Sequence, residues 1–215
     1  MAERTWWCPS CEVVGRSGRC WNCGRTLEPQ GPEPVRRLAD LLADGDTGRP
    51  MRLRDARPEE RGAVATLVME AYDEFRPYVD PAFVEGFMAD LRDFESRSAH
   101  TQLIVAEGDG GISGAVTFFP DASRYGPGLP ADWGAIRLLA VAPAARGSGL
   151  GRSLVAACIE RAGARGSRAI VLHTTPFMQA ARRLYEGMGF QRVPELDVEL
   201  GAGVRVLGYR LPLAP

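Results

Sequence analysis

Hydrophobic residues recur along residues 51–215 with two kinds of spacing, and each kind predicts its own type of element. Alternating or uninterrupted apolar runs are typical of strands, whereas apolar residues three or four positions apart are typical of helices. Strands are expected at residues 51–54, 102–107, 112–119, 135–142, 169–173, 191–199 and 204–211. Helices are expected to carry apolar stripes within residues 64–75, 83–91, 150–162 and 177–188.

The order of these elements is β-α-α-β-β-β-α-β-α-β-β, which predicts an α/β (α+β) domain over residues 51–215. A mixed sheet with helices on its faces would bury the apolar side of each element. Residues 1–28 show no such periodicity. Residues 29–50 are rich in proline and hold one short apolar stripe, so we expect a linker with a short helix there.

The composition is that of an ordinary globular protein, with 215 residues, 45% of them hydrophobic and 25% charged. The net charge of −1 gives no general attraction to nucleic acid or to an anionic membrane. The sequence has no apolar run of about 18 residues and no signal sequence, so we expect a cytoplasmic protein. All 26 basic residues are arginine, which excludes lysine as a nucleophile.

A glycine-rich turn at residues 141–152 (V-A-P-A-A-R-G-S-G-L-G-R) joins an expected buried strand to an expected amphipathic helix. Its alternate glycines, Gly147, Gly149 and Gly151, lack a Cβ, so their backbone N–H groups can approach phosphate oxygens closely. The start of the helix adds unpaired N–H donors, and two arginines of the turn add positive charge. We interpret this turn as a pyrophosphate site.

Two other phosphate-binding loops fit the turn less well. The P-loop pattern requires a lysine, and the chain has none. The dinucleotide fingerprint G-x-G-x-x-G would place its third glycine at Leu154. A flexible turn without a ligand is the remaining alternative.

Two segments of the chain resemble the GNAT superfamily of N-acetyltransferases. One is the R-x-x-G-x-G motif of residues 146–151, and the other is the A-x-x-L-Y-x-x-x-G-F pattern of residues 181–190. The resemblance covers residues 51–211 in element order. It implies the GNAT-type acyl-CoA acyltransferase fold, with a mixed and mostly antiparallel sheet, and acetyl-CoA as the cosubstrate.

The resemblance also implies where acetyl-CoA would bind. The fourth strand of the domain is expected to splay from the fifth, and backbone groups of the fourth strand are expected to pair with the pantetheine amides. The N–H groups of the glycine-rich turn are expected to bind the pyrophosphate. The implied residues are Leu139, Val141, Arg146, Gly147, Ser148, Gly149, Leu150, Gly151 and Arg152.

Catalysis in this family implies direct attack of an amine on the thioester in a ternary complex. The Val141 N–H is the implied donor to the oxyanion, and Tyr185 is the implied acid that protonates the thiolate. Packing is the alternative role for Tyr185, because it borders the apolar stripe of its helix. The catalytic base stays open: Ala135 stands where many members carry glutamate, and Asp132 and Glu107 are the nearby candidates.

Three further side chains with reactive groups have expected places in the fold. His173 is expected at the end of strand 169–173, within reach of the cleft, and a structural role is favoured for it. His100 is expected to be solvated. Cys158 lies on the apolar face of an expected helix, which predicts a buried and inert thiol.

Four of the five cysteines cluster near the N-terminus with the spacing C-x2-C-x8-C-x2-C. They are Cys8, Cys11, Cys20 and Cys23. This spacing predicts a tetrahedral structural Zn²⁺ site within residues 1–28, similar to short zinc-ribbon and zinc-knuckle modules. A thioredoxin-type dithiol is the alternative, but residues 1–28 are too short for its βαβ context.

The sequence therefore predicts an N-acetyltransferase that moves an acetyl group from acetyl-CoA to a primary amine of a small molecule or protein. The alternative is a non-catalytic acyl-CoA sensor or adaptor that recruits a protein partner through the zinc module. A nucleic-acid-binding module is less favoured, because no basic stripe extends beyond the N-terminal residues. A homodimer is a further expectation from the resemblance. A cationic acceptor is suggested by residues on segments that the resemblance places beside the acceptor, namely Asp73, Glu74, Asp80 and Glu85 with Tyr72 and Tyr78.

Overall fold

A computed structural model of the chain describes residues 6–8, 13–15, 51–78, 98–199 and 205–213. The chain divides into two compact units, Met1–Arg37 and Leu38–Pro215. This division falls inside the expected linker at residues 29–50. The three-part division expected from the sequence stays a prediction.

The first unit contains a short antiparallel ribbon that the sequence pattern did not predict. Strands β1 (Trp6–Cys8) and β2 (Val13–Gly15) pair with Cys8 opposite Val13. The first cysteine of the expected zinc site therefore ends a strand. Cys11, Cys20 and Cys23 lie outside the described residues.

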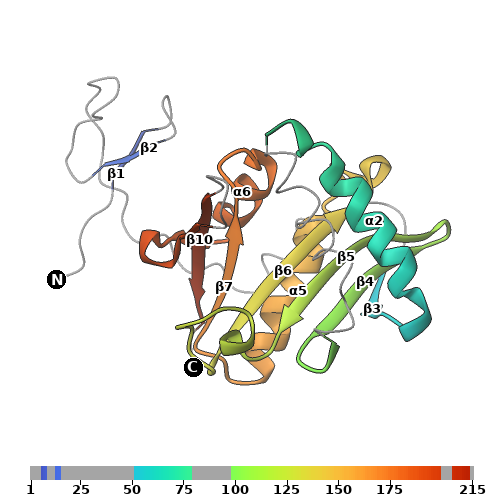
Figure 1. Cartoon of the computed structure of the whole chain (residues 1–215), viewed down its shortest axis with the longest axis horizontal. Helices are drawn as coiled ribbons and strands as arrows, with labels where there is room; N and C mark the ends of the chain where they lie inside the picture. Colours follow the sequence, from blue (N-terminus) through green and yellow to red (C-terminus); the bar gives the residue numbers. More distant parts are fainter. Residues whose placement is uncertain (1–5, 9–12, 16–50, 79–97, 200–204, 214–215) are drawn as a thin grey trace. The chain divides into compact units, whose positions relative to one another are not determined.

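The second unit is built on one mixed sheet with the order β3-β4-β5-β6-β7-β10-β8 (Figure 1). A further strand, β9, pairs with β10. Every neighbouring pair is antiparallel except β6 and β7, which are parallel, so the predicted mixed and mostly antiparallel sheet is confirmed. The strands are β3 (Arg52–Asp55), β4 (Gln102–Gly108), β5 (Gly111–Phe119), β6 (Trp133–Val141), β7 (Ala169–Thr174), β8 (Gln191–Arg192), β9 (Val198–Glu199) and β10 (Arg205–Pro212).

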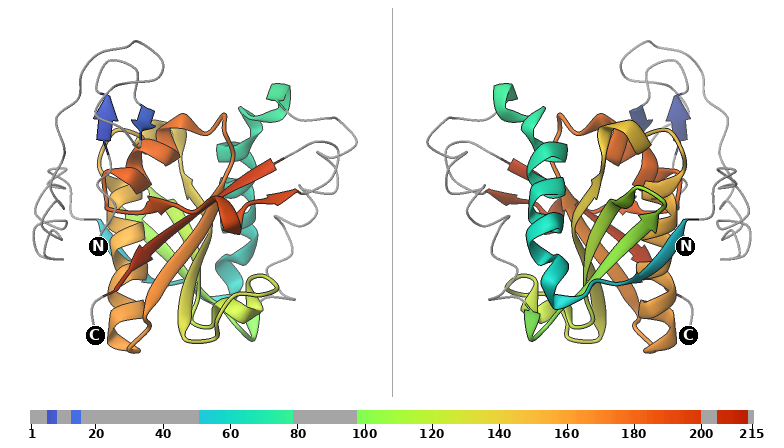
Figure 2. Two further views of the ribbon diagram at one scale, coloured as in Figure 1. Left: turned by 90° about the vertical axis from the view of Figure 1, so that its left-hand side faces the viewer. Right: turned by 90° about the vertical axis from the view of Figure 1, so that its right-hand side faces the viewer.

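Helices cover both faces of the sheet, as the element order predicts (Figure 2). One face carries α2 (Arg61–Asp73), and the opposite face carries α5 (Leu150–Ala164) and α6 (Gln179–Glu186). The helix expected after Pro81 lies outside the described residues. Short 3-10 turns occupy Pro58–Glu60, Arg76–Tyr78, Ala122–Arg124, Pro143–Ala145 and Pro194–Leu196.

The prediction of one strand over residues 191–199 is wrong. The turn Pro194–Leu196 divides this segment into β8 and β9, because Pro194 has no N–H to donate to a strand ladder. The buried Asp197 carboxylate holds the turn against β10 by accepting the Gly208 N–H at 3.0 Å. Both short strands then pair with different parts of β10.

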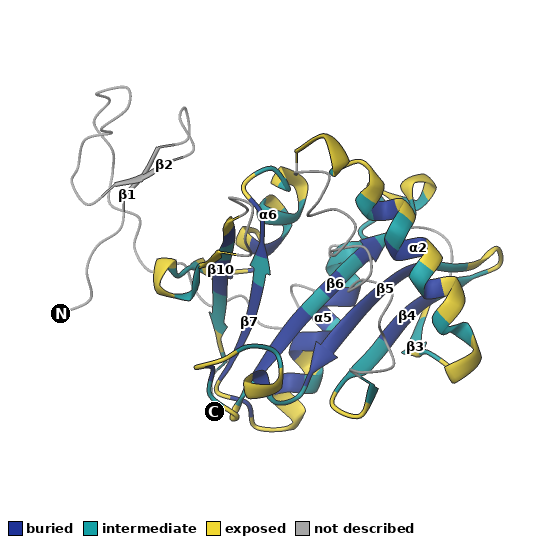
Figure 3. Ribbon diagram, in the orientation of Figure 1, coloured by how far each residue is buried: buried dark blue, intermediate teal, exposed yellow. Residues whose placement is uncertain are grey.

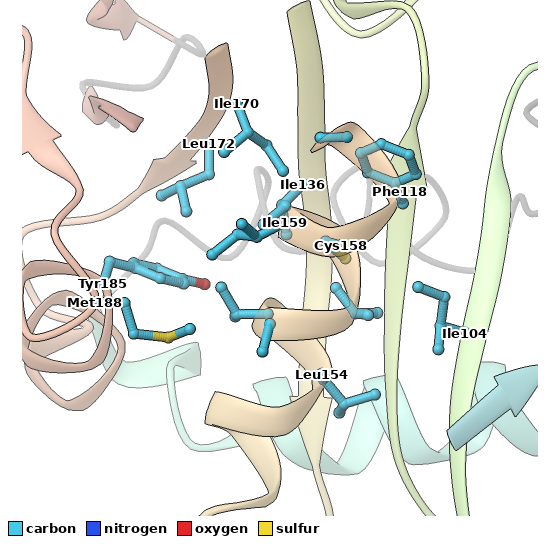
Figure 4. Packing of buried hydrophobic residues seen from close by; sticks show 14 of the residues in the cluster. Ile104, Phe118, Ile136, Leu154, Cys158, Ile159, Ile170, Leu172, Tyr185 and Met188 are labelled. Carbon is cyan, nitrogen blue, oxygen red and sulfur yellow. The ribbon is translucent and has the colours of Figure 1, made fainter. Parts of the chain in front are cut away.

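The larger core lies between α5 and the sheet, where the strands are buried along most of their length (Figures 3 and 4). Cys158 of α5 is fully buried there, and burial raises the pKa of its thiol. The predicted buried thiol is confirmed. Other fully or nearly buried members of this core are Ile104, Val116, Phe118, Ile136, Leu154, Val155, Ile159, Ile170 and Leu172.

Two smaller clusters cover the α2 face of the sheet. In one, α2 packs against β4, β5 and β6 through Val64, Leu67, Val68, Ala71, Val105, Ala115, Leu138 and Ala140. In the other, the connection between β5 and β6 folds back over the sheet. This third cluster contains Phe119, Ala122, Leu129, Ala135 and Val171, with Tyr125, Trp133 and Leu196 packed against it.

Candidate active site

Strands β6 and β7 lie side by side for only part of their length. Their pairing runs from Trp133 opposite Ala169 to Ile136 opposite Leu172 and goes no further. β6 continues to Val141, where it still pairs with β5. In the described part of the chain, the β7-facing edge of β6 beyond Ile136 therefore has no strand beside it. We call this stretch, residues 137–141, the β6–β7 split, and its presence agrees with the expected splay.

A bulge in β6 lies within the split. Ala115 of β5 pairs with Ala140, and Thr117 pairs with Arg137, so β6 has one extra residue between these pairs. Leu138 there has a φ of 56°, the only positive φ of a non-glycine residue in the described ranges. A bulge of this kind bends and twists a strand. The buried Leu138 side chain packs in the cluster between α2 and strands β4, β5 and β6, and this packing holds the strained backbone in place.

The main-chain groups of Leu139 and Val141 face the split. The Ala142 N–H donates to the Ser113 carbonyl at 2.8 Å, so the groups of Ala142 point toward β5. Main-chain groups alternate along a strand, and those of Val141 and Leu139 therefore point to the other edge. From α2, the Tyr72 hydroxyl reaches the Leu139 carbonyl at 3.5 Å. Both residues lie where the resemblance places them, and their pairing with pantetheine stays a prediction.

The glycine-rich turn presents a run of N–H donors at the start of α5. Gly147 and Gly149 have φ values of 78° and 81°, which glycine adopts without a steric penalty. Within the described structure, the backbone N–H groups of residues 147–152 have no hydrogen-bond acceptor. The Ser148 hydroxyl donates instead to the Ala145 carbonyl at 2.7 Å, which closes the turn. These bare donors at a helix N-terminus form a typical anion site.

The missing Cβ of Gly151, the third glycine of the turn, also allows close packing. A Cβ on Gly151 would lie 3.3 Å from Leu184 Cδ2 and 3.8 Å from Val141 Cγ2. Gly151 therefore lets the first turn of α5 pack closely against α6 and β6. Its side of the helix is a packing surface, and only its N–H remains available to a ligand.

The two arginines of the turn differ in their surroundings. Arg146 donates to the Glu74 carboxylate at 2.9 Å and to the Ala71 carbonyl at 3.3 Å, so its guanidinium connects the turn to the end of α2. Arg152 has an enclosed Nη1 without a hydrogen-bond partner in the described structure. Arg152 therefore carries an unsatisfied donor at the start of α5.

Tyr185 of α6 lies at the edge of the larger core. Its ring is 6% exposed and packs against Phe190, with 5.8 Å between the ring centroids. Figure 4 shows its hydroxyl end directed away from α6, toward α5. Burial raises the pKa of the phenol, and the nearby phenols of Tyr72 and Tyr125 add to this effect. The ring packs as the alternative interpretation expected, while the hydroxyl stays protonated and able to donate a proton.

A family model agrees with this geometry. The model of the Acetyltransferase (GNAT) family matches residues 68–190, more than half of the 215-residue chain. The chain belongs to the GNAT family. The matched range includes the β6–β7 split, the glycine-rich turn and Tyr185.

Individual relatives of this GNAT chain agree with the assignment. YhfO of Bacillus subtilis (strain 168), an uncharacterized N-acetyltransferase, is 28% identical over 142 residues, which are 66% of this chain and 90% of YhfO. A GNAT acetyltransferase from Brucella melitensis, solved with acetyl-CoA, has a TM-score of 0.54 at 20% identity, over 78% of this chain and 90% of that one. The structure of yncA from Salmonella typhimurium, also with acetyl-CoA, has a TM-score of 0.52 at 22% identity. The match covers 77% of this chain and 95% of the yncA chain.

The carboxylates considered as the base of this GNAT protein are held by arginines. Glu107 accepts from Arg54 at 2.8 Å, which lowers the pKa of the carboxylate. Asp132 is paired with Arg168. The charged form of Glu107 is stabilised in this way, so Glu107 is a weak proton acceptor. Ala135, which has no carboxylate, lies in the third cluster.

The acidic residues that suggested a cationic acceptor are also engaged. Asp73 is paired with Arg76, and Glu74 is paired with Arg146. Asp80 and Glu85 lie outside the described residues. The described structure therefore gives no separate support for a cationic acceptor from these side chains.

His173 forms a hydrogen-bonded pair with Tyr125, a residue that sequence reasoning missed. His173 Nε2 lies 2.6 Å from the Leu196 carbonyl, which can only accept, so Nε2 carries the ring proton. Nδ1 is then bare and accepts from the Tyr125 hydroxyl at 2.7 Å. Burial lowers the pKa of His173, which keeps it neutral. Only the fold reveals this pair, because Tyr125 lies in a glycine- and proline-rich connection without a motif.

Metal ligands and membrane-spanning helices can be assessed for the described residues. Among them, no group of three or more His, Cys, Asp or Glu side chains is placed to hold a metal ion. The side chains of all four N-terminal cysteines lie outside the described part of the chain, so the zinc site stays a prediction. No helix in the described ranges has the length and apolar character needed to cross a membrane.

Proposed function

We propose that this GNAT protein is an acetyl-CoA-dependent N-acetyltransferase that acts on a primary amine of a small molecule or protein. The observation that supports this most directly is the run of bare N–H donors at residues 147–152 beside the β6–β7 split. The two GNAT structures from Brucella melitensis and Salmonella typhimurium contain acetyl-CoA, in the same fold.

In the proposed complex, acetyl-CoA lies along the exposed edge of β6. The N–H groups of residues 147–152 bind the pyrophosphate, with Arg146 and Arg152 adding positive charge. Main-chain groups of Leu139 and Val141 pair with the pantetheine amides. The Val141 N–H then donates to the thioester oxygen as negative charge develops on it.

The acetyl group moves by direct attack of the neutral amine on the thioester carbon. The new C–N bond forms as the oxyanion develops at Val141, and the C–S bond then breaks. Tyr185 gives its proton to the departing thiolate and regains one from the attacking nitrogen. Because burial raises the pKa of Tyr185, the phenol is protonated before the reaction starts and readily takes back a proton after it has given one up.

Coenzyme A binding is the first test of the proposal. We expect calorimetric titration to detect CoA binding by the full chain and to lose it in Gly149→Glu, whose side chain would enter the anion site. Gly166→Glu is the matched control, because Gly166 also has a positive φ of 72° and lies after α5, at its opposite end. Equal binding by both variants would contradict the proposed site.

Turnover is the second test. Tyr185→Phe should lower acetyl transfer by roughly 100-fold, the usual range for losing a general acid, with CoA affinity unchanged. Tyr209→Phe is the matched control, because it removes another buried hydroxyl, which donates to Glu186 at 2.7 Å. Equal losses in the two variants would assign Tyr185 a packing role alone.

A non-catalytic acyl-CoA sensor or adaptor is the alternative proposal. It predicts the same CoA binding but no thiol release with any member of an amine library. The transfer assay with wild-type protein therefore separates the two proposals.

For residues 1–28, the proposal is a structural Zn²⁺ held by Cys8, Cys11, Cys20 and Cys23, with a protein partner as the target of the module. Support comes from the cysteine spacing. Metal analysis of purified protein should find one zinc per chain, and a Cys20→Ser/Cys23→Ser variant should lose it.

Sedimentation of the same protein would test the expected homodimer.

A further inference from the structure

Tyr125 and His173 lie beside the β6–β7 split on the α2 face of the sheet. Val171 belongs to the third cluster on this face, and side chains alternate along a strand, so His173 points the same way. His173 directly follows Leu172, the last residue of β7 that pairs with β6. Tyr125 packs against the third cluster from the β5–β6 connection. Both side chains are half-buried and keep some exposed surface.

The pair is close to the residues proposed for the chemistry. Tyr72 packs against the cluster formed by α2, and Tyr125 packs against the third cluster, so both phenols lie on the α2 face of the sheet. Tyr72 itself contacts the Leu139 carbonyl on the split. Tyr125 therefore lies on the same face of the sheet as Tyr72, beside the split where the thioester is proposed to lie.

The hydrogen bonds of the pair have a fixed direction. The Tyr125 hydroxyl donates to Nδ1 of His173, so its oxygen lone pairs are free to accept a proton from a ligand. If Nδ1 takes the Tyr125 proton, the imidazolium has both N–H groups satisfied, by Tyr125 and by the Leu196 carbonyl. The pair can therefore accept a proton without leaving an unpaired donor.

The groups around His173 have opposite effects on the pKa of its imidazole. Burial lowers the pKa of His173, and the charges of Arg192 and Arg137 lower it further. The Leu196 carbonyl and the Asp197 carboxylate raise it. His173 is therefore neutral before the reaction, while Leu196 and Asp197 stabilise its protonated form.

We propose that Tyr125 takes the proton of the acceptor ammonium and passes its own proton to His173. This inference rests on the proposed acetyltransferase activity and supplies the base that the arginine-bound carboxylates do not provide. Tyr125 is the catalytic residue of the pair, and His173 acts through it as a positioning residue that stores the proton.

The proton balance of this step is complete. The ammonium loses one proton to the Tyr125 oxygen, and the original Tyr125 proton moves to His173 Nδ1. The products are a neutral amine and an imidazolium. His173 later releases this proton to water, which is the one proton that acetylation of an ammonium by a thioester releases overall.

The test compares two acceptors in wild-type protein and Tyr125→Phe. With an alkylamine, which is protonated at pH 7, the variant should lose roughly 100-fold or more in kcat, as expected for a missing base. With an O-alkylhydroxylamine, which is neutral at pH 7, wild type and variant should react at similar rates. The phenylalanine keeps the ring contacts with Phe119 and His173.

Equal losses with both acceptors, or no loss with either, would overturn the base role of Tyr125. If wild-type protein transfers acetyl to no amine, the proposed function fails and this inference fails with it. If wild-type protein transfers acetyl but Tyr125→Phe changes the rates with the alkylamine and the O-alkylhydroxylamine equally, only this inference is overturned.

A second variant tests the part played by His173. His173→Gln should lower the alkylamine rate at pH 7, and the loss should shrink as the pH rises and the free amine becomes abundant. His100→Gln is the matched control, because His100 is exposed. Near-ultraviolet circular dichroism and CoA affinity would check that each variant is folded. A loss that does not change with pH would show that His173 only supports the structure.

Discussion

The Arg146 guanidinium lies 2.9 Å from the Glu74 carboxylate, and this pair joins the glycine-rich turn to the end of α2. The turn carries the bare N–H donors, whereas α2 carries Tyr72, which contacts the β6–β7 split. Both side chains of the pair are substantially exposed, at 40% and 48%. The pair therefore connects the turn to α2 without adding much to the stability of the fold.

Substitutions in this pair should affect CoA binding and stability differently. Glu74→Gln should change the free energy of unfolding by less than about 1 kcal/mol, the usual limit for an exposed ion pair. CoA affinity should stay the same or rise, because the Arg146 charge is no longer neutralised. Arg146→Ala should weaken CoA binding by roughly tenfold, the size of one charge-assisted hydrogen bond. Urea unfolding and calorimetry measure these effects, and weaker CoA binding by Glu74→Gln would contradict the expectation.

The left-handed backbone at Leu138 predicts that a glycine variant is more stable than an alanine variant at this position, the reverse of the usual order. In the middle of an ordinary strand, a protein with glycine is less stable than one with alanine by about 0.5–1 kcal/mol. At a positive φ the order reverses, because a Cβ there costs about 1–2 kcal/mol. Both Leu138→Ala and Leu138→Gly should be destabilised by loss of the buried side chain, but the glycine variant should be the more stable of the two.

Ile136 is the control for this prediction. It lies two residues earlier in β6, is buried, and is not among the residues with a positive φ. Ile136→Gly should therefore be less stable than Ile136→Ala in urea unfolding. The same order at both positions would contradict the strain assigned to Leu138.

The sequence was sufficient to predict the described elements whose signals are local. Apolar spacing predicted α2, α5 and the central strands, and the glycine-rich turn predicted the start of α5. These signals depend on neighbours within a few positions, so they can be read along the chain. The boundaries of most of these elements agree within a few residues.

Features that depend on distant contacts could not be predicted in this way. The bulge at Leu138 requires knowledge of how β6 pairs with β5, and its strain is held by packing against α2. Tyr125 and His173 are 48 positions apart and meet only because the β5–β6 connection folds over the sheet. Candidate carboxylates could be found from sequence, but the arginines that hold them could not.

The buried thiol of Cys158 predicts resistance to alkylation. Burial raises the pKa of this thiol, so the reactive thiolate is rare in the folded protein. Iodoacetamide should leave Cys158 unmodified in native protein at pH 8 and modify it fully in denaturant. Peptide mass spectrometry can follow Cys158 separately from the four N-terminal cysteines. Rapid native modification of Cys158 would show that α5 opens away from the sheet.

The surroundings of the Asp197 carboxylate predict that the fold loses stability at acid pH. Its side chain is 8% exposed and pairs with Arg192 and Arg205, each at 2.6 Å, while it accepts the Gly208 N–H at 3.0 Å. Burial alone would raise the pKa of Asp197, but the hydrogen bonds from Arg192 and Gly208 outweigh it and lower the pKa.

The carboxyl group of Asp197 has a lower pKa in the folded protein than in the unfolded chain. The ionised carboxylate therefore stabilises the fold at pH values above the unfolded pKa of about 3.9. That contribution should disappear as the pH falls through the lower, folded value. Asp197→Asn should cost about 1–2 kcal/mol in urea unfolding at pH 7 and progressively less below about pH 4. Asp73→Asn, which removes an exposed pair with Arg76, is the control and should cost less than about 1 kcal/mol at any pH. A cost for Asp197→Asn that stays constant down to acid unfolding would show that its ionisation does not stabilise the β8–β10 region.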